Sequence, residues 1–257
     1  MRYIPLYLIP LALLLTAVML LGACFSQSST DGLGTPPRAS GELDPHTLVI
    51  ALLPDEDPAA ILQHHQPFSD YLQARLGKEI KLVIHHDYSI MVEAMRSGDL
   101  HLAYFGPATY IVTKDSGAHI EPFAAKKTRG STTYTSLIIA PGSSEVSSLE
   151  ELAGKRMAYG DPGSTSSHLI PKFLLLEAGL RPNADYHEVF LGAHDAVALN
   201  VAQGNADAGG LSASIYRSLL QRGVIQEDQT RIIQESPPFP QYPWTMRSDL
   251  SPALKQA

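Results

Sequence analysis

Strand-like and helix-like patterns alternate along most of this chain, and no other feature constrains its fold as strongly. A first series alternates short apolar runs, which predict strands, with amphipathic segments, which predict helices: residues 46–54, 67–77, 78–86, 89–98 and 99–107. A β-rich segment leads into a second series of the same kind: residues 131–141, then 147–154, 155–160, 164–179, 186–192, 193–204, 206–212 and 214–223. This alternation implies parallel-rich sheets with helices on both faces. Two such series joined by an extended segment predict an α/β protein of two lobes with a cleft between them.

Three predicted loops, each following a strand and opening a helix, are the strongest candidates for a ligand site. They read YFGPATY, YGDPGSTSS and LGAHDAVA, at residues 104–110, 159–167 and 191–198. In open α/β sheets, ligands bind beyond the carboxyl ends of the strands, where such loops lie. We therefore expect ligand-binding residues in these loops.

The second loop contains more hydroxyl side chains than a helix start requires. Four of them run from Ser164 to Ser167, although one is enough to cap a helix. A helix N-terminus binds oxyanions through its free N–H groups and its dipole, and Ser164, Thr165 and Ser166 could add donors. Gly163 would allow close backbone approach. The alternative is one capping hydroxyl with the others solvated, and this stretch alone does not decide between the two.

The third loop repeats the arrangement, with His194 and Asp195 at the start of a helix. His194 could donate a hydrogen bond to an anion, but taken alone a surface position is favoured. Asp195 is expected to be a first-turn acid that matches the helix dipole. Asp207 is expected to close the turn before the next strand.

The N-terminus predicts export. Arg2 precedes an apolar run that ends in small residues and the single cysteine, Cys24, which is typical of a secretory signal over residues 1–23. Leu21 to Cys24, LGAC, resembles a bacterial lipobox, in which the cysteine is lipidated, although Gly22 is a less usual residue there. An uncleaved membrane anchor is the alternative. Residues 24–44, rich in Ser, Gly, Pro and Thr, predict a flexible tether.

The net charge of −7 argues against a nucleic-acid partner, because no basic stripe offsets it. It also means that a bound anion has to be held by local dipoles, not by the overall field. The single cysteine leaves no intramolecular disulfide, so stability has to come from packing.

Four blocks of the sequence resemble the phosphonate/phosphite/phosphate-binding (PhnD-type) periplasmic proteins of ABC importers. They are residues 85–112, 159–175, 192–209 and 232–255. The blocks occur in the family's order and spacing, and the similarity runs from about residue 47 to the end. Members usually continue with another helix after SDLSPALKQA, where the given sequence ends.

The resemblance implies a two-lobed periplasmic-binding-protein fold of type 2 with a hinged ligand cleft. One lobe would comprise residues 45–136, completed by about 232–257, and the other residues 137–231. The implied function is to bind a small phosphorus oxyanion outside the cytoplasmic membrane and pass it to a membrane permease. The implied protein is a monomeric lipoprotein and not an enzyme, and it needs neither cofactor nor metal.

The resemblance also implies a set of ligand-binding residues. The family's anion-binding turn falls on Ser164, Thr165 and Ser166, and its histidine falls on His194. Its two cleft tyrosines fall on Tyr88 and Tyr134. Composition alone would make these tyrosines half-buried core residues.

The chain departs from the family's pattern in two places. Members often carry Thr-Asn followed by a polar or acidic residue where this chain has GLSAS, at residues 210–214. They often have an acid in the late segment, where this chain has Gln241 and Tyr242. Because a carboxylate there could pair with a ligand ammonium, its absence weakens the case for aminoalkylphosphonates.

Two rival functions are weakly supported. Ser164, His194 and Asp207 could be drawn as a hydrolase triad, but the G-x-S-x-G elbow is missing and no spacing shows an acid that orients the base.

Metal capture is suggested by the ten histidines, which include the pairs at 64–65 and 85–86. Adjacent strand residues point to opposite faces, and no H-E-x-x-H or paired-cysteine motif occurs.

A third alternative keeps the fold and changes the role. A binding protein of this kind could signal to a membrane receptor or histidine kinase instead of feeding a permease, and the sequence does not separate the two.

Overall fold

The computed structural model describes residues 42–128 and 130–257. The predicted signal segment, Cys24 and all but the last three residues of the predicted tether lie outside the described residues. Within the described part of the chain, no helix combines the length and the apolar character needed to cross a membrane.

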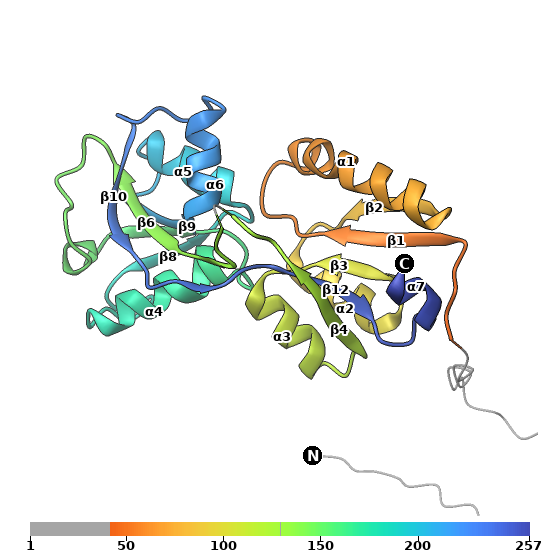
Figure 1. Ribbon diagram of the computed structural model, residues 1–257. Helices are drawn as coiled ribbons and strands as arrows, with labels where there is room; N and C mark the ends of the chain where they lie inside the picture. The colour runs from red at the N-terminus through yellow and green to blue at the C-terminus, as the bar shows by residue number, and fades with distance from the viewer. Residues whose placement is uncertain (1–41, 129) are drawn as a thin grey trace, which may run out of the picture. The chain divides into compact units, whose positions relative to one another are not determined.

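The first of two five-stranded sheets has the strand order β2-β1-β3-β12-β4 (Figure 1). Its strands are β1 (Thr47–Leu52), β2 (Glu79–Ile84), β3 (Leu102–Tyr104), β4 (Ile120–Ala125) and β12 (Pro243–Arg247). β1 pairs in parallel with β2 and β3, and its register with β3 places Ile50 opposite Leu102. β12 runs antiparallel between β3 and β4, so the late part of the chain completes the sheet.

The second sheet has the strand order β10-β6-β9-β7-β8. Its strands are β6 (Ser136–Pro141), β7 (Arg156–Tyr159), β8 (His187–Phe190), β9 (Ala208–Ser212) and β10 (Thr230–Glu235). β7 is parallel to β8 and β9, whereas β6 is antiparallel to β9 and β10. Each sheet combines two parallel with two antiparallel strand pairs. Helices flank both sheets, which confirms the predicted α/β class.

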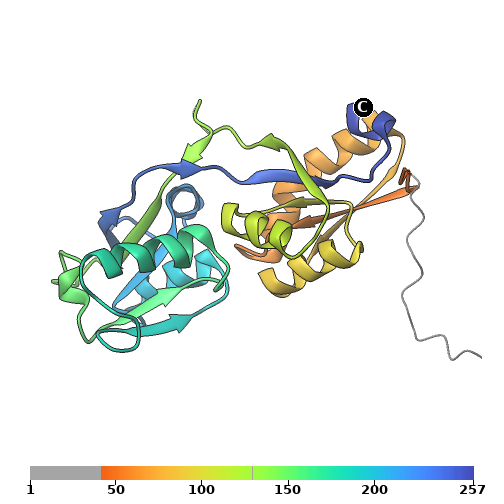
Figure 2. The ribbon, with the colours of Figure 1, turned by 90° about the horizontal axis from the view of Figure 1, so that it is seen from below.

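Two segments connect the sheets and pair with each other. They contribute β5 (Thr133–Tyr134) and β11 (Phe239–Pro240), which form a two-stranded antiparallel ribbon. Figure 2 shows these two segments running side by side from one sheet to the other. Tyr134 therefore lies on the crossing itself, opposite Phe239.

Helices cover the sheets and begin at the loops that follow the strands (Figure 1). They are α1 (Pro58–Leu76), α2 (Tyr88–Ser97), α3 (Pro107–Asp115), η1 (Glu150–Leu152), η2 (Thr165–Leu169), α4 (Ile170–Glu177), α5 (His194–Ala202), α6 (Ala213–Gln221) and α7 (Pro252–Gln256). The predicted helix ends at Gly77 and Gly98 are confirmed, because both glycines adopt the left-handed conformation, with φ of 62° and 89°.

One helix starts earlier than the sequence pattern predicts. The amphipathic pattern predicted a helix over residues 67–77, but α1 begins at Pro58 and contains Pro67. Asp57 and Pro58 supply a start signal of the same kind about ten residues earlier. The Asp57 side chain caps the helix by accepting from the N–H of Ala60 at 3.0 Å.

Each sheet has its own apolar core. The largest fully buried side chains around the first sheet come from β1 and the residue after it, from α2 and from the segments on either side of β3: Leu48, Ile50, Leu52, Leu53, Met91, Leu100 and Phe105. Those around the second sheet come from β6, β7 and the β8 strand entry: Leu137, Ile138, Ile139, Tyr159 and Tyr186. Each core packs against its sheet, and the packed strands fix the positions of the loops at their ends.

Candidate functional site

The hydroxyl-rich loop starts a helix whose first turn is a π-turn, η2, followed directly by α4. Ser164 is the cap, and its Oγ accepts from the N–H of Ser167 at 3.1 Å. Ser164 is only 2% exposed, and Ser166 and Ser167 are fully buried. The alternative in which one hydroxyl caps the helix and the others are solvated is therefore wrong.

The remaining hydroxyls of this loop have different partners. The Ser167 hydroxyl donates to the carbonyl of Gly210 and accepts from the N–H of Gly160, the latter at 2.7 Å, so it fastens the turn to the second sheet. Thr165 Oγ1 accepts from the N–H of Ala108 at 2.9 Å, at the start of α3. The buried Ser166 Oγ has no hydrogen-bond partner among the described residues.

His194 is completely buried at the start of α5, so the surface position favoured by its sequence context is wrong. Its Nδ1 accepts a hydrogen bond from the N–H of Ser212 at 3.0 Å, which requires the proton of the neutral ring to be on Nε2. Nε2 lies 3.4 Å from Ser164 Oγ. Burial lowers the pKa of His194 to about 3, so the ring is a neutral donor at physiological pH.

Tyr88 and Tyr134 are 2% and 7% exposed, which is more buried than their sequence context indicates. In the described part of the chain neither hydroxyl has a hydrogen-bond partner. The Tyr134 ring contacts Phe239 and Tyr242, with centroids 4.4 and 5.2 Å away. Burial raises the pKa of both phenols, so both remain protonated donors at physiological pH.

The structure brings the six residues expected to bind the ligand into one cluster. The Ser164 hydroxyl approaches that of Tyr88 closely enough for weak hydrogen bonding to lower the tyrosine pKa in part, and Ser166 and Thr165 act in the same way on Tyr134. None of these approaches has the geometry of a full hydrogen bond. His194 joins the cluster through Ser164. The members come from the start of α2, the crossing ribbon, the η2 turn and the start of α5.

Hydrogen bonds connect the two sheets around this cluster. The carboxylate of Asp161 accepts from the N–H of Tyr88 at 3.2 Å and from that of Gly163 at 2.6 Å. The N–H of His194 donates to the carbonyl of Asp55 at 2.8 Å. Asp195, expected to be a first-turn acid, accepts from the N–H of Asp57 at 2.8 Å and so also crosses between the sheets.

Two residues of the cluster were not predicted from the sequence. Asp161 holds the start of α2 beside the hydroxyl turn, and the carboxyl of Asp55 is close enough to Tyr88, Tyr134 and Tyr242 to affect their pKa values. Asp55 follows β1 at its carboxyl end. Residues 54–57, PDED, thus also form a loop at the carboxyl end of a strand, where ligands bind in open α/β sheets. The loop was not predicted as a site because it contains no hydroxyl or histidine side chain.

Asp55 gives the folded protein a pH dependence. Burial, aided by the charge of Glu56, raises the pKa of its carboxyl from 3.8 to about 7. The unfolded chain therefore ionises Asp55 at a lower pH than the folded protein does, and folding stability falls as the pH rises from about 4 to 7.

We expect Asp55→Asn to stabilise the unliganded protein, by an amount that grows by about 2 kcal/mol between pH 5 and pH 8. Urea denaturation of both proteins at the two pH values measures this difference. Asp115→Asn, at an exposed acid on α3, is the matched control. The same gain from Asp55→Asn at both pH values would contradict the expectation.

The geometry of the triad residues does not fit a hydrolase. The carboxylate of Asp207 accepts from the backbone N–H of Arg156 at 2.8 Å and pairs with its side chain, so it joins the start of β9 to β7 and does not close its own turn as expected. Because His194 Nδ1 accepts a hydrogen bond, it cannot donate to an orienting acid. Across residues 42–128 and 130–257, no group of three or more His, Cys, Asp or Glu side chains is placed to hold a metal ion.

Residues 50–257 match the family described as periplasmic substrate-binding proteins of phosphonate ABC transporters, and the chain belongs to this family. It is 30% identical to the phosphate-import protein PhnD of Mycolicibacterium smegmatis, over 81% of this chain and 68% of that protein. It is 24% identical to a probable phosphite-binding protein, PhnD1, of Prochlorococcus marinus, over 80% of this chain and 72% of that protein.

Solved structures have the same fold. A binding protein component of an ABC phosphonate transporter from Pseudomonas aeruginosa superposes with a TM-score of 0.77, at 24% identity, over 83% of this chain and 72% of that one. PhnD1 of Prochlorococcus marinus in complex with methylphosphonate gives a TM-score of 0.76 at 22% identity, over 83% of this chain and 82% of that one. The predicted family and the predicted periplasmic-binding-protein fold are confirmed. The sensing role is not favoured by these relatives, which are named for import and binding.

Proposed function

We propose that this protein is a lipoprotein, anchored through Cys24, that binds a small phosphorus oxyanion and delivers it to an ABC permease. The candidate ligands are phosphonate, phosphite and phosphate. The observation that carries the proposal is a set of three buried hydroxyls, on Tyr88, Tyr134 and Ser166, that make no hydrogen bond of normal geometry in the described part of the protein. Buried polar groups are nearly always hydrogen-bonded, so donors left over in one cluster indicate a ligand.

The chemistry of the cluster suits an oxyanion. Nε2–H of His194 and the hydroxyls of Ser164 and Thr165 complete the donors, and the first-turn N–H groups of η2 have no intrahelical partners. A helix N-terminus with surrounding hydroxyls stabilises negative charge without a lysine or arginine. Hydroxyls both donate and accept, so they also suit an anion that still carries a proton.

Binding would proceed by closure of two lobes, comprising residues 45–136 with about 232–257, and residues 137–231. The pairs Asp161–Tyr88, Thr165–Ala108 and His194–Asp55 are the contacts that closure would make. The ribbon of β5 and β11 is the natural hinge, because it joins the two sheets. A ligand that prefers the closed arrangement shifts the population toward it, and the permease would recognise that form.

The proposal is tested by titration calorimetry and thermal unfolding with phosphate, phosphite, methylphosphonate and sulfate. We expect at least one phosphorus oxyanion to bind and to stabilise the protein, by about 2.7 kcal/mol at one hundred times its dissociation constant, with sulfate bound far more weakly. A cooperatively folded protein that binds none of the phosphorus oxyanions would overturn the proposal.

Neighbouring serines provide a matched pair of variants. Ser166→Ala removes an unpartnered hydroxyl and is expected to weaken oxyanion binding by about 1–3 kcal/mol while leaving the unliganded protein equally stable. Ser167→Ala removes the hydroxyl that holds Gly160 and Gly210, and is expected to lower the free energy of unfolding by a similar amount. Calorimetry and urea denaturation of both variants separate the two roles. A stability loss in Ser166→Ala as large as in Ser167→Ala would show that Ser166 is structural.

A further inference from the structure

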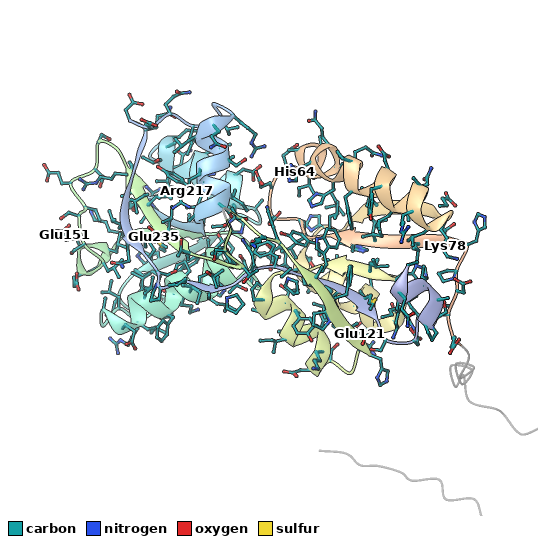
Figure 3. The ribbon with its side chains drawn as sticks, in the orientation of Figure 1. His64, Lys78, Glu121, Glu151, Arg217 and Glu235 are labelled. Carbon is teal, nitrogen blue, oxygen red and sulfur yellow. The ribbon has the colours of Figure 1, made fainter. Side chains whose placement is uncertain are left out.

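A cavity of about 710 Å³ lies beside the oxyanion cluster. It is lined by the first half of α1, by α6 and by the late strand β12, and Figure 3 shows His64 of this lining on the end of α1 that lies near α6. Pockets of about 300–1,000 Å³ typically hold whole small organic molecules. The cavity therefore has room for far more than the few atoms of a phosphorus oxyanion.

A continuous row of aromatic rings connects this cavity to the oxyanion cluster. Phe68 and Tyr104 both contact Trp244, with ring centroids 4.6 and 4.8 Å from it. Tyr242 follows at 5.2 Å from Tyr104 and lies at the same distance from Tyr134, whose hydroxyl belongs to the cluster. These rings pack tilted or edge-to-face, and those that line the cavity give it an aromatic wall against which another flat, apolar group can pack.

The charges around the cavity oppose each other. Arg222 forms an ion pair with Glu56, and Lys126 lowers the pKa of Asp55 through its positive charge. All four side chains line the cavity. Arg222 and Glu56 already balance each other, so a ligand ammonium would be left facing Lys126, and a second ligand anion would be left facing Asp55 whenever that carboxyl is ionised. The cavity therefore favours an uncharged group over either ion.

We propose that this cavity, here called the substituent pocket, holds an uncharged aromatic group attached to the phosphorus of the ligand. The ligand would be an organophosphonate or a phosphate monoester, with its oxyanion at Tyr88, Ser166 and His194 and its substituent along the rings of Tyr242, Tyr104 and Trp244. The proposal rests on the proposed function, because the oxyanion cluster has to bind the charged end. Asp55 and Tyr242 contribute to both places, which positions them at the junction of oxyanion and substituent.

The first test needs no variant. Titration calorimetry compares phosphate, methylphosphonate, 2-aminoethylphosphonate and phenylphosphonate on the wild-type protein, with phenyl phosphate to represent the monoesters. We expect phenylphosphonate or phenyl phosphate to bind at least tenfold more tightly than methylphosphonate and 2-aminoethylphosphonate. If the small oxyanions bind and neither phenyl compound gains affinity, the substituent pocket is overturned while the proposed function stands. If no phosphorus compound binds, the proposed function fails.

A variant then locates the substituent. Ser218 on α6 lines the substituent pocket, and Ser218→Phe would fill part of it without touching the oxyanion cluster. Gln221→Phe, at an exposed position on the same helix, is the matched control. We expect Ser218→Phe to remove the tenfold advantage of the phenyl compounds and to leave methylphosphonate binding unchanged. If each ligand binds Ser218→Phe as tightly as it binds the control and the wild type, the placement of the substituent is overturned.

Discussion

Replacing His194 with Asn is expected to weaken oxyanion binding by roughly 10- to 100-fold while leaving the unliganded protein almost as stable as the wild type. The Asn Oδ1 occupies the place of His194 Nδ1 and can accept from the N–H of Ser212, as the ring does at 3.0 Å. The donor at Nε2, which lies 3.4 Å from Ser164 Oγ, is lost. A hydrogen bond to a charged group contributes about 1.5–3 kcal/mol, which is the size of the expected loss.

The complementary variant is His194→Gln. The Gln amide nitrogen reaches the place of Nε2, but no acceptor remains for the N–H of Ser212, which is buried with the histidine. We expect His194→Gln to lower the free energy of unfolding by about 1–3 kcal/mol and to keep more of the binding than His194→Asn. Calorimetry and urea denaturation measure both quantities. The reverse ranking in binding would mean that Nε2 does not face the ligand.

Gly210→Ala is expected to damage both folding and binding. A Cβ at Gly210 would lie 2.6 Å from Pro171 Cγ and 3.0 Å from the carbonyl oxygen of Ser167, where no real Cβ fits without movement. Such overpacking costs about 1–3 kcal/mol. Because η2 and α4 would have to move off β9, the hydroxyl turn would shift with them. We expect oxyanion binding to fall at least tenfold.

Gly106→Ala is the control for this effect. It lies in another loop of the site, and its Cβ would meet nothing closer than Thr109 Oγ1, at 3.5 Å. We expect it to change stability by less than about 1 kcal/mol, since 3.5 Å is an ordinary contact distance. Urea denaturation and calorimetry of the two glycine variants provide the comparison. If Gly210→Ala binds and unfolds like the wild type, the turn is not held against β9 as closely as the structure shows.

Local signals predicted many of the strand and helix boundaries. Gly77 and Gly98 end helices because they adopt the left-handed conformation at low cost, and Ser164 caps a helix, as its residue type favours. β4 was missed because Pro122 interrupts its apolar run and its outer residues are exposed. The start of α1 was misplaced to Pro67, and a proline that is tolerated inside a helix looks the same in sequence as one that begins it.

The site was predictable where residue type carries the chemistry, and not where burial decides it. Composition and position marked the hydroxyls at 164–166 as a candidate anion-binding turn, but only the family resemblance favoured that role over simple helix capping. The burial of His194 was not predicted, because it depends on Ser212 from a later strand. Asp55 has a raised pKa only because residues far along the chain enclose it, and a run of acids in a loop otherwise predicts exposure.

The place of β12 in the first sheet has a consequence for how the protein is made. β12 lies between β3 and β4, yet it is formed by residues 243–247, near the end of the chain. Until those residues leave the ribosome, β3 and β4 have no common partner, and their unpaired edges are open to other chains. The second sheet is drawn from one uninterrupted stretch, residues 136–235, and is free of this dependence. The first sheet therefore begins to be synthesised before the second sheet but can be completed only after it.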